Sequence, residues 1–299
     1  MFYNNLITFV ALLLFFTGAL NAAPVKVVAI SEDFASIAKS IGKEHVAVKS
    51  LVLGSRNLHS INPKPSMVMM LKNADLLIRL GMSQDKWIDG LIHVAKNPNL
   101  FPGKQGYLDA SDNVEKLEVP QENIDGSMGD VHLHGNPHYW LNPKNGIVIA
   151  EQIKQALTTL DPKNASDYEA NFFEFSETLG EKIKVWKQAL QGYQNHNFVT
   201  YHKAWSYFFD GFNLNMAGEL EPLPGIAPTT RHLVSLGRKL KESNSPTVVM
   251  STIFYPKNVS QSFAKKQNAK FVFVSTSVGS DGVTSYMGLF DYLVKEVTQ

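Results

Sequence analysis

The chain of 299 residues contains no cysteine, and this absence excludes several kinds of site at once. Without cysteine there is no disulfide framework, no thiolate metal site and no residue that could carry a lipid anchor on sulfur. A charge of one sign is lacking too, because 28 basic residues stand against 27 acidic ones. A near-neutral chain has no electrostatic footprint for nucleic acid, so we expect no nucleic-acid partner.

Long hydrophobic runs are also scarce, and the notable one is the stretch at residues 6–20. It is shorter than the roughly 20 residues that a membrane-spanning helix needs. With Ala22 and Ala23 behind it, it fits the apolar part of a secretory signal peptide. Residues 1–5 lack Lys and Arg, so an uncleaved amphiphilic anchor stays an alternative. We expect residues 1–23 to be a signal peptide and the mature chain to be exported to a bacterial periplasm.

Strand-like and helix-like segments alternate along the chain. Residues 25–30 form an unbroken apolar run, and the helical spacing after it ends at Gly42. We expect further strands at residues 46–53, 76–80, 105–108, 198–200, 214–219, 247–253 and 271–274, and further helices at 65–72, 86–96, 142–160, 204–209, 229–241, 258–266 and 285–297. Such alternation predicts parallel sheets with helices on both faces, an α/β fold.

One helix is expected to be far longer than the others. Asp161 and Pro162 form a helix start, and the segment up to about residue 191 has no further proline and one glycine. Its apolar residues recur in steps of three and four: Tyr168, Phe172, Phe175, Leu179, Ile183, Trp186 and Leu190. Such a helix is about 40 Å long, more than one lobe needs. We therefore predict two α/β lobes, residues 24–160 and 193–299, joined by a linking helix at 161–192.

The segment at residues 130–143, DVHLHGNPHYWLNP, contains three of the nine histidines within seven residues. Imidazole is the commonest protein ligand for metals, and two prolines restrict the backbone around His138. Ligands of open α/β sheets bind beyond the carboxyl ends of the strands. The metal-competent residues expected there are His59, His138, His202 and Asp281. Two come from each lobe, which predicts a metal site between the lobes.

Other histidines have simpler interpretations. His93, His196 and His232 are expected to be solvated surface residues. His132 and His134 stand beside Gly135 in a polar loop, where two interpretations are open: a flap that captures metal transiently, or a solvated loop.

Four motifs resemble those of a known family. Residues 58–66, LHSINPKPS, ahead of KNADLLI at 72–78, look like the first metal motif of the zinc- and manganese-binding solute-binding proteins of ABC importers. NPHYWLNP at 136–143 resembles their second motif, with Asn142 where the family usually has Asp. VTYHKAWSYF at 199–208 is similar to the third, and SDG at 280–282 ahead of SYM at 285–287 to the fourth. The resemblance covers essentially the whole mature chain.

This resemblance implies two small α/β lobes joined by a rigid helix, with one divalent metal ion held by His59, His138, His202 and Asp281. It also implies a monomeric carrier that is not an enzyme, with the membrane permease of an ABC importer as its partner. Two departures from the family's pattern lie around the proposed metal ligands and do not touch them. Residues 251–253 replace a glutamate found at a strand end in many relatives, and the loop before His138 is shorter than in some zinc members.

The chemistry of that ligand set agrees with carrying a metal. Three neutral imidazoles and one carboxylate suit Zn²⁺, and a closed shell leaves no position for an activated water. Mn²⁺ prefers more oxygen ligands, so His202 favours zinc, with manganese as the alternative cargo. Because imidazoles bind metal only when neutral, we expect the affinity to fall below about pH 6.5. We also expect binding to order loops rather than to hinge the lobes.

Two other functions compete with import. The spacing His132-x-His134-x-x-x-His138 resembles a metallohydrolase cluster, but it lacks the aspartate of that pattern and a general base beside it. A periplasmic metal chaperone that works without an importer fits the same residues as the importer protein does.

Overall fold

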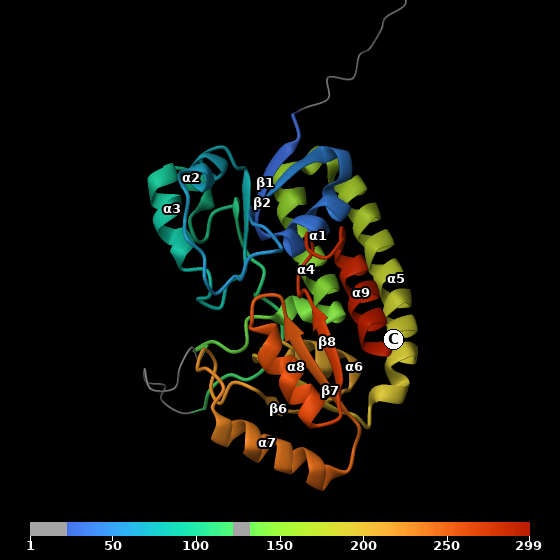
Figure 1. Ribbon diagram of the computed structural model, residues 1–299. Helices are drawn as coiled ribbons and strands as arrows, with labels where there is room; N and C mark the ends of the chain where they lie inside the picture. The colour runs from blue at the N-terminus through green and yellow to red at the C-terminus, as the bar shows by residue number, and fades with distance from the viewer. Residues whose placement is uncertain (1–22, 122–131) are drawn as a thin grey trace, which may run out of the picture.

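The computed structural model describes residues 23–121 and 132–299, so nearly all of the predicted signal peptide lies outside the described residues. Two separate four-stranded sheets form, both entirely parallel, with the strand orders β2-β1-β3-β4 and β6-β5-β7-β8 (Figure 1). The strands are β1 Val25–Ser31, β2 Val46–Val52, β3 Leu76–Arg79, β4 Tyr107–Asp109, β5 Asn197–Thr200, β6 Asn215–Glu219, β7 Thr247–Thr252 and β8 Lys270–Val274. The predicted α/β class with two parallel-sheet lobes is confirmed.

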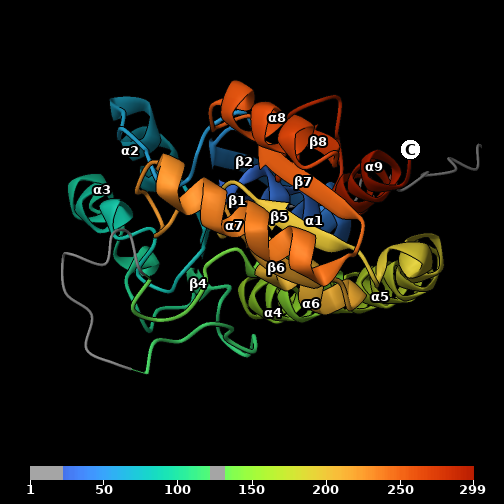
Figure 2. The same ribbon diagram turned by 60° about the horizontal axis from the view of Figure 1, so that its bottom comes forward.

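Helices follow the strands as the alternation predicts. They are α1 Glu32–Gly42, α2 Pro65–Lys72, α3 Trp87–Ala95, α4 Pro143–Leu160, α5 Ala165–Leu190, α6 Ser206–Phe212, α7 Thr230–Ser243, α8 Lys257–Lys266 and α9 Tyr286–Thr298. Side-chain caps explain several of the starts, because they satisfy backbone N–H groups that the first turn leaves free. Asn142 caps α4, Thr229 caps α7 and Ser285 caps α9. Helices α2 and α3 lie on the side of the molecule away from α5 (Figure 2).

Helix α5 runs along both lobes (Figure 1). It has 26 residues, and short 3-10 turns at Pro162–Asn164 and Gln191–Tyr193 flank it. It packs against α1 and α4 of the first lobe and against α9 at the end of the chain. The stripe that sequence periodicity predicts is its buried face, apart from Phe172, which is half-buried. The long helix thus joins the lobes as expected.

The two lobes share one hydrophobic core. A single cluster of buried side chains extends from Ile30 in β1 and Phe34 in α1 to Val274 in β8 and Phe290 in α9. A second, smaller cluster lies on the other face of the second sheet, around Val249. Burial of apolar surface is the main favourable term in folding, so a core common to both lobes holds them in one arrangement.

Polar contacts across the lobe boundary strengthen this arrangement. The Val278 backbone N–H donates to Asp33 Oδ1 at 2.9 Å, and the Tyr286 hydroxyl donates to the Trp140 carbonyl oxygen at 2.7 Å. Trp140 Nε1 in turn donates to the carbonyl oxygen of Thr276 at 3.0 Å. Across the described residues, no helix combines the length and apolar character needed to cross a membrane.

Candidate metal centre

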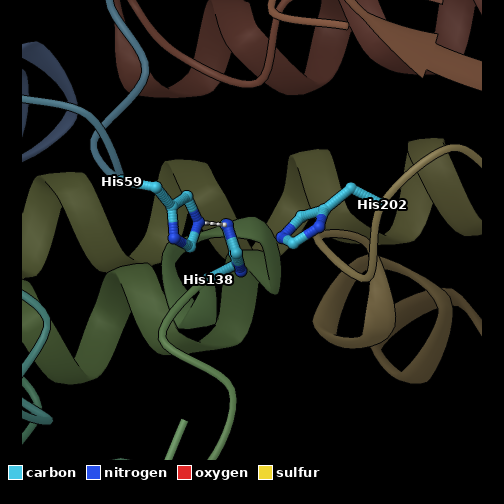
Figure 3. Close-up of side chains that lie close together, drawn as sticks. All are labelled: His59, His138 and His202. Atoms are coloured by element: carbon cyan, nitrogen blue, oxygen red, sulfur yellow. Dashed lines mark hydrogen bonds between the residues drawn. The ribbon is translucent and has the colours of Figure 1, made fainter. Parts of the chain in front are cut away.

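Three histidines from three separate loops converge between the lobes. His59 lies in the loop after β2, His138 comes just before the one-turn 3-10 helix Tyr139–Leu141, and His202 is the second residue after β5. One ring nitrogen from each lies within 4.8 Å of one nitrogen from each of the others. The ring centroids are 5.1, 5.2 and 5.8 Å apart, and Figure 3 shows the rings turned toward one another. Sequence reasoning predicted these three residues, and the structure brings them together.

Polar side chains fix the orientation of two of these rings. His138 Nδ1 lies 2.9 Å from Asn136 Oδ1, and His202 Nδ1 lies 2.8 Å from Glu221 Oε2. Metal-binding histidines usually donate one ring N–H to such a partner, which presents the other nitrogen to the metal. His202 Nε2 is buried and has no hydrogen-bond partner in the described part of the chain. A buried polar atom of this kind costs free energy unless a ligand binds it.

The third ring completes a chain of hydrogen bonds. His59 Nδ1 lies 3.0 Å from Gln84 Nε2, and His59 Nε2 lies 3.0 Å from His138 Nε2 (Figure 3). In this arrangement the Gln84 amide donates to His59, His59 donates to His138, and His138 donates to Asn136. His59 and His138 would hold a metal ion through these nitrogens, and His59 would then release the proton from its Nε2. Gln84 can then turn its amide oxygen toward His59 Nδ1, because the two amide orientations fill the same space.

The electrostatics of the cluster favour neutral imidazole. Burial lowers the pKa of His138 well below 6.5, and the nearby His59, His202 and His132 rings lower it further. A histidine with a lowered pKa is neutral at physiological pH and needs to release no proton from its Nε2 before it binds a metal.

The predicted fourth ligand, Asp281, does not belong to this group of three. It is exposed, and it sits in a turn after β8 with a left-handed φ of 51°. Its Oδ2 accepts hydrogen bonds from the Ser275 backbone N–H and from the Tyr292 hydroxyl, both at 3.1 Å. This carboxylate therefore ties the end of β8 to α9. Its assignment as a ligand stays a prediction.

A histidine whose role the sequence left open does lie beside the cluster. The His132 ring centroid is 5.2 Å from that of His59 and 6.4 Å from that of His138. His134, two residues on, is exposed to solvent. Residues 122–131 of the same loop are outside the described residues.

Sequence reasoning missed the residues that orient the rings, above all Glu221. It lies just past the carboxyl end of β6, the strand beside β5, so the rule that located His202 could have located it as well. Two further histidines, which were expected to be solvated, are half-buried in the structure. His232 Nε2 lies 2.8 Å from the carbonyl oxygen of Glu219, and the His196 ring packs at a tilt against Tyr193, with 4.7 Å between the centroids. His93 is exposed, as expected.

Two parallel-sheet lobes with a cluster of metal-competent imidazoles between them define the class, a metal-binding protein of the solute-binding type. The family model described as ZnuA, zinc-uptake complex component A, periplasmic, matches residues 27–299, and the chain belongs to this family. The prediction of a metal-binding protein of an ABC importer, rather than a metallohydrolase, is thereby confirmed. Proteins of this class work with a membrane permease and an ATPase.

Curated relatives and solved structures agree with this family. The manganese ABC transporter substrate-binding lipoprotein PsaA of Streptococcus pneumoniae is 28% identical over 234 residues, which cover 76% of this chain and 72% of PsaA. The metal ABC transporter substrate-binding lipoprotein SloC of Streptococcus mutans is 28% identical over 223 residues, 73% of this chain and 69% of SloC. The crystal structure of ZnuA has a TM-score of 0.76 at 22% identity and covers 92% of this chain and 98% of its own. The Mn-bound periplasmic metal binding protein of Candidatus Liberibacter asiaticus has the same TM-score and coverages at 21% identity.

Proposed function

We propose that this protein binds one divalent metal ion between its lobes, zinc in preference to manganese, and delivers it to the membrane permease of an ABC importer. The observation that supports this most directly is the convergence of His59, His138 and His202, with the Nδ1 of each ring beside a polar side chain. Imidazole nitrogens suit Zn²⁺, whereas Mn²⁺ prefers a set richer in oxygen. The names of the relatives include manganese transport, so manganese is the alternative cargo.

The carboxylate nearest the cluster supports carriage rather than catalysis. Glu221 Oε2 is bonded to His202 Nδ1 at 2.8 Å and accepts from the Gly225 backbone N–H at 3.2 Å. It therefore orients a ligand, and it is not directed at the position where a metal-bound water would need a general base.

We place the protein in the periplasm, as a monomer whose residues 1–23 are removed as a signal peptide. The relatives are named lipoproteins, whereas this sequence contains no cysteine that could carry a lipid. N-terminal sequencing of the protein from a periplasmic fraction tests this placement. A start near residue 24 is expected, and a chain retained in the membrane fraction with residues 1–23 attached would contradict it.

Metal binding is tested by elemental analysis and a competitive zinc titration on residues 24–299. We expect one tight equivalent in the parent and its loss in His138→Ala. His93→Ala, which removes an exposed histidine from α3, is the control and should keep the full equivalent. Two equivalents in the parent, or undiminished binding by His138→Ala, would show that the site is misassigned.

Delivery to an importer is tested in cells that lack the protein. Zinc uptake should be restored by the parent chain and not by His138→Ala. A chaperone that works without an importer would leave zinc uptake unchanged when the parent chain is supplied.

A further inference from the structure

We propose that the outer face of helices α7 and α8 is a contact site for anionic phospholipid, which holds the second lobe against the membrane that contains the permease. The inference goes beyond metal binding and uses no residue of the metal centre. It starts from an uneven distribution of charge along the chain. Residues 222–280 contain eight Lys and Arg and a single acidic residue, Glu242, whereas the rest of the chain has 20 basic and 26 acidic residues.

Helices α7 and α8 cover the same face of the second sheet. Leu236 and Leu240 of α7 and Phe263 of α8 belong to the smaller of the two hydrophobic clusters. A Cβ at Gly237 of α7 would lie 2.6 Å from Nε2 of Gln267, the residue that follows the last turn of α8. The two helices therefore present one outer surface. Helix α7 lies at the end of the molecule opposite the first lobe (Figure 1).

Five cations of this surface, which we call the basic face, are exposed and make no ion pair within the described part of the chain. They are Arg231, Arg238 and Lys241 of α7 and Lys265 and Lys266 of α8. Steps of seven and three residues place the three cations of α7 on one side of that helix. Like charges that have no partners repel one another, so a surface of negative charge relieves this repulsion.

The three remaining cations of residues 222–280 are tied to the body of the lobe and do not belong to the basic face. Lys239 Nζ donates to the Ala217 carbonyl oxygen at 3.2 Å. Lys257 Nζ lies 4.8 Å from the centre of the Phe273 ring, and Lys270 Nζ donates to the carbonyl oxygen of Val297 at 2.6 Å. The five cations of the basic face have no such contacts, so their long side chains can follow a fluid array of lipid head groups.

An apolar side chain lies within the basic face. Val234 is 58% exposed on α7, three residues after Arg231 and four before Arg238, so it shares their side of the helix. Leu223 and Ile226, in the segment ahead of α7, are exposed as well. Helices that bind to membrane surfaces combine cations with exposed apolar residues. Phospholipid supplies a phosphate for the cations and acyl chains for the apolar side chains, whereas a nucleic acid backbone supplies only the phosphate.

The basic face is connected to the metal centre by a short piece of chain. Glu221, which lies beside His202, stands nine residues before the start of α7. In the first turn of that helix, His232 Nε2 lies 2.8 Å from the carbonyl oxygen of Glu219. Contact of α7 with lipid therefore keeps the second lobe, with its ligand His202, close to the membrane in which the permease receives the ion.

Flotation of residues 24–299 with vesicles of equal parts phosphatidylglycerol and phosphatidylcholine tests the proposal. We expect binding in low salt and its loss at about 1 M salt, where the Debye length falls to about 3 Å. Vesicles of phosphatidylcholine alone should not bind the protein. Binding that persists in high salt, or that needs no phosphatidylglycerol, would overturn the proposal.

Two triple variants locate the contact. Combining Arg238→Gln, Lys241→Gln and Lys265→Gln should weaken vesicle binding about 100-fold, because each cation near an anionic surface contributes roughly fivefold. The matched control removes the same charge from exposed lysines of the first lobe, by Lys72→Gln, Lys96→Gln and Lys104→Gln, and should bind vesicles like the parent. Both variants should bind zinc like the parent, so a folding defect is recognised separately.

A chain without cysteine also allows a dye to be placed at a single position. An environment-sensitive dye on Val234→Cys should shift its emission to shorter wavelength when the anionic vesicles are added. The same dye on Phe173→Cys, which is exposed on α5, should not respond.

Three results would overturn the lipid contact. They are a parent that does not bind the anionic vesicles, equal binding by the two triple variants, and tighter binding of the parent to duplex DNA than to the vesicles at the same salt. The last result would assign the basic face to nucleic acid. Because zinc binding is measured separately, each of them leaves the proposed carriage of metal intact.

Discussion

Asp33 is a buried carboxyl group at the boundary between the lobes, and its replacement by asparagine should change how stability depends on pH. It is fully buried in the first turn of α1, and its Oδ1 accepts from the Val278 backbone N–H of the second lobe. Burial raises the pKa of Asp33 from 3.8 to about 7, although hydrogen bonds from Val278, Ser31 and Ser277 partly oppose the rise. Asparagine has the same shape and keeps one oxygen acceptor, but it carries no charge at any pH.

The sign and size of the effect follow from this raised pKa. A group whose pKa is higher in the folded state contributes stability that is complete below its unfolded pKa and is lost as the pH rises through its folded pKa. At about 1.4 kcal/mol per pH unit, a pKa raised from 3.8 to about 7 corresponds to ~4 kcal/mol. Because the unfolded aspartate is already ionised at pH 5, roughly 3 kcal/mol of this loss falls between pH 5 and pH 8.

Urea unfolding of metal-free parent and Asp33→Asn at pH 5 and pH 8 measures this loss. From pH 5 to pH 8, the free energy of unfolding of the parent should fall by about 3 kcal/mol more than that of the variant. Glu32→Gln, which removes the neighbouring acid of the same helical turn, is the control for a general effect of charge at the start of α1. Parallel pH dependences in the parent and in Asp33→Asn would refute the reasoning.

Three further predictions concern the site and its surroundings. Glu221→Gln should weaken zinc binding 10–100-fold, because His202 loses the partner that orients it; a competitive titration that finds no change would count against this role. Gly54→Ala should lower both the Tm and the zinc affinity, because the new Cβ would collide with the Val278 carbonyl oxygen of the other lobe; thermal scans and titrations measure both. In metal-free protein the contribution of His138 to stability should fall as the pH drops below about 6.5, because His138, whose pKa is lowered in the fold, takes up its proton on unfolding. This loss opposes the gain from Asp33, so it is measured as the difference between the parent and His138→Ala in urea unfolding at pH 7 and pH 5.

The elements of the fold could be predicted closely because local signals mark them. Helix α2 begins at Pro65 and ends at Lys72, as its sequence predicts, since proline is favoured at a first helical position. The stripe on α5 and the apolar runs of the strands are equally local features. What no local pattern reveals is that α9, the last helix of the second lobe in sequence order, packs on α1 and α5. That contact depends on how the two lobes dock.

The metal site likewise has a part that the sequence predicts and a part that only the folded chain reveals. The rule that ligands lie beyond the carboxyl ends of parallel strands located His59, His138 and His202. It did not place the His132 ring beside His59, because that position depends on a turn closed by Gly135, and it did not reveal the two hydrogen bonds that engage Asp281. Such contacts join residues through the folded chain, and sequence spacing does not encode them.

The shared core bears on how metal binding becomes visible to a partner. A hinge motion of the lobes would have to break the bonds of Asp33 to Val278 and of Tyr286 to Trp140, and it would expose apolar surface that both lobes bury. The ligands, by contrast, come from loops, and His59 is only half-buried. Metal binding can therefore order the loops at little cost to the core, whereas opening the lobes is expensive. The surface that a permease distinguishes is then expected to be the loop surface around the site, with the spacing of the lobes unchanged.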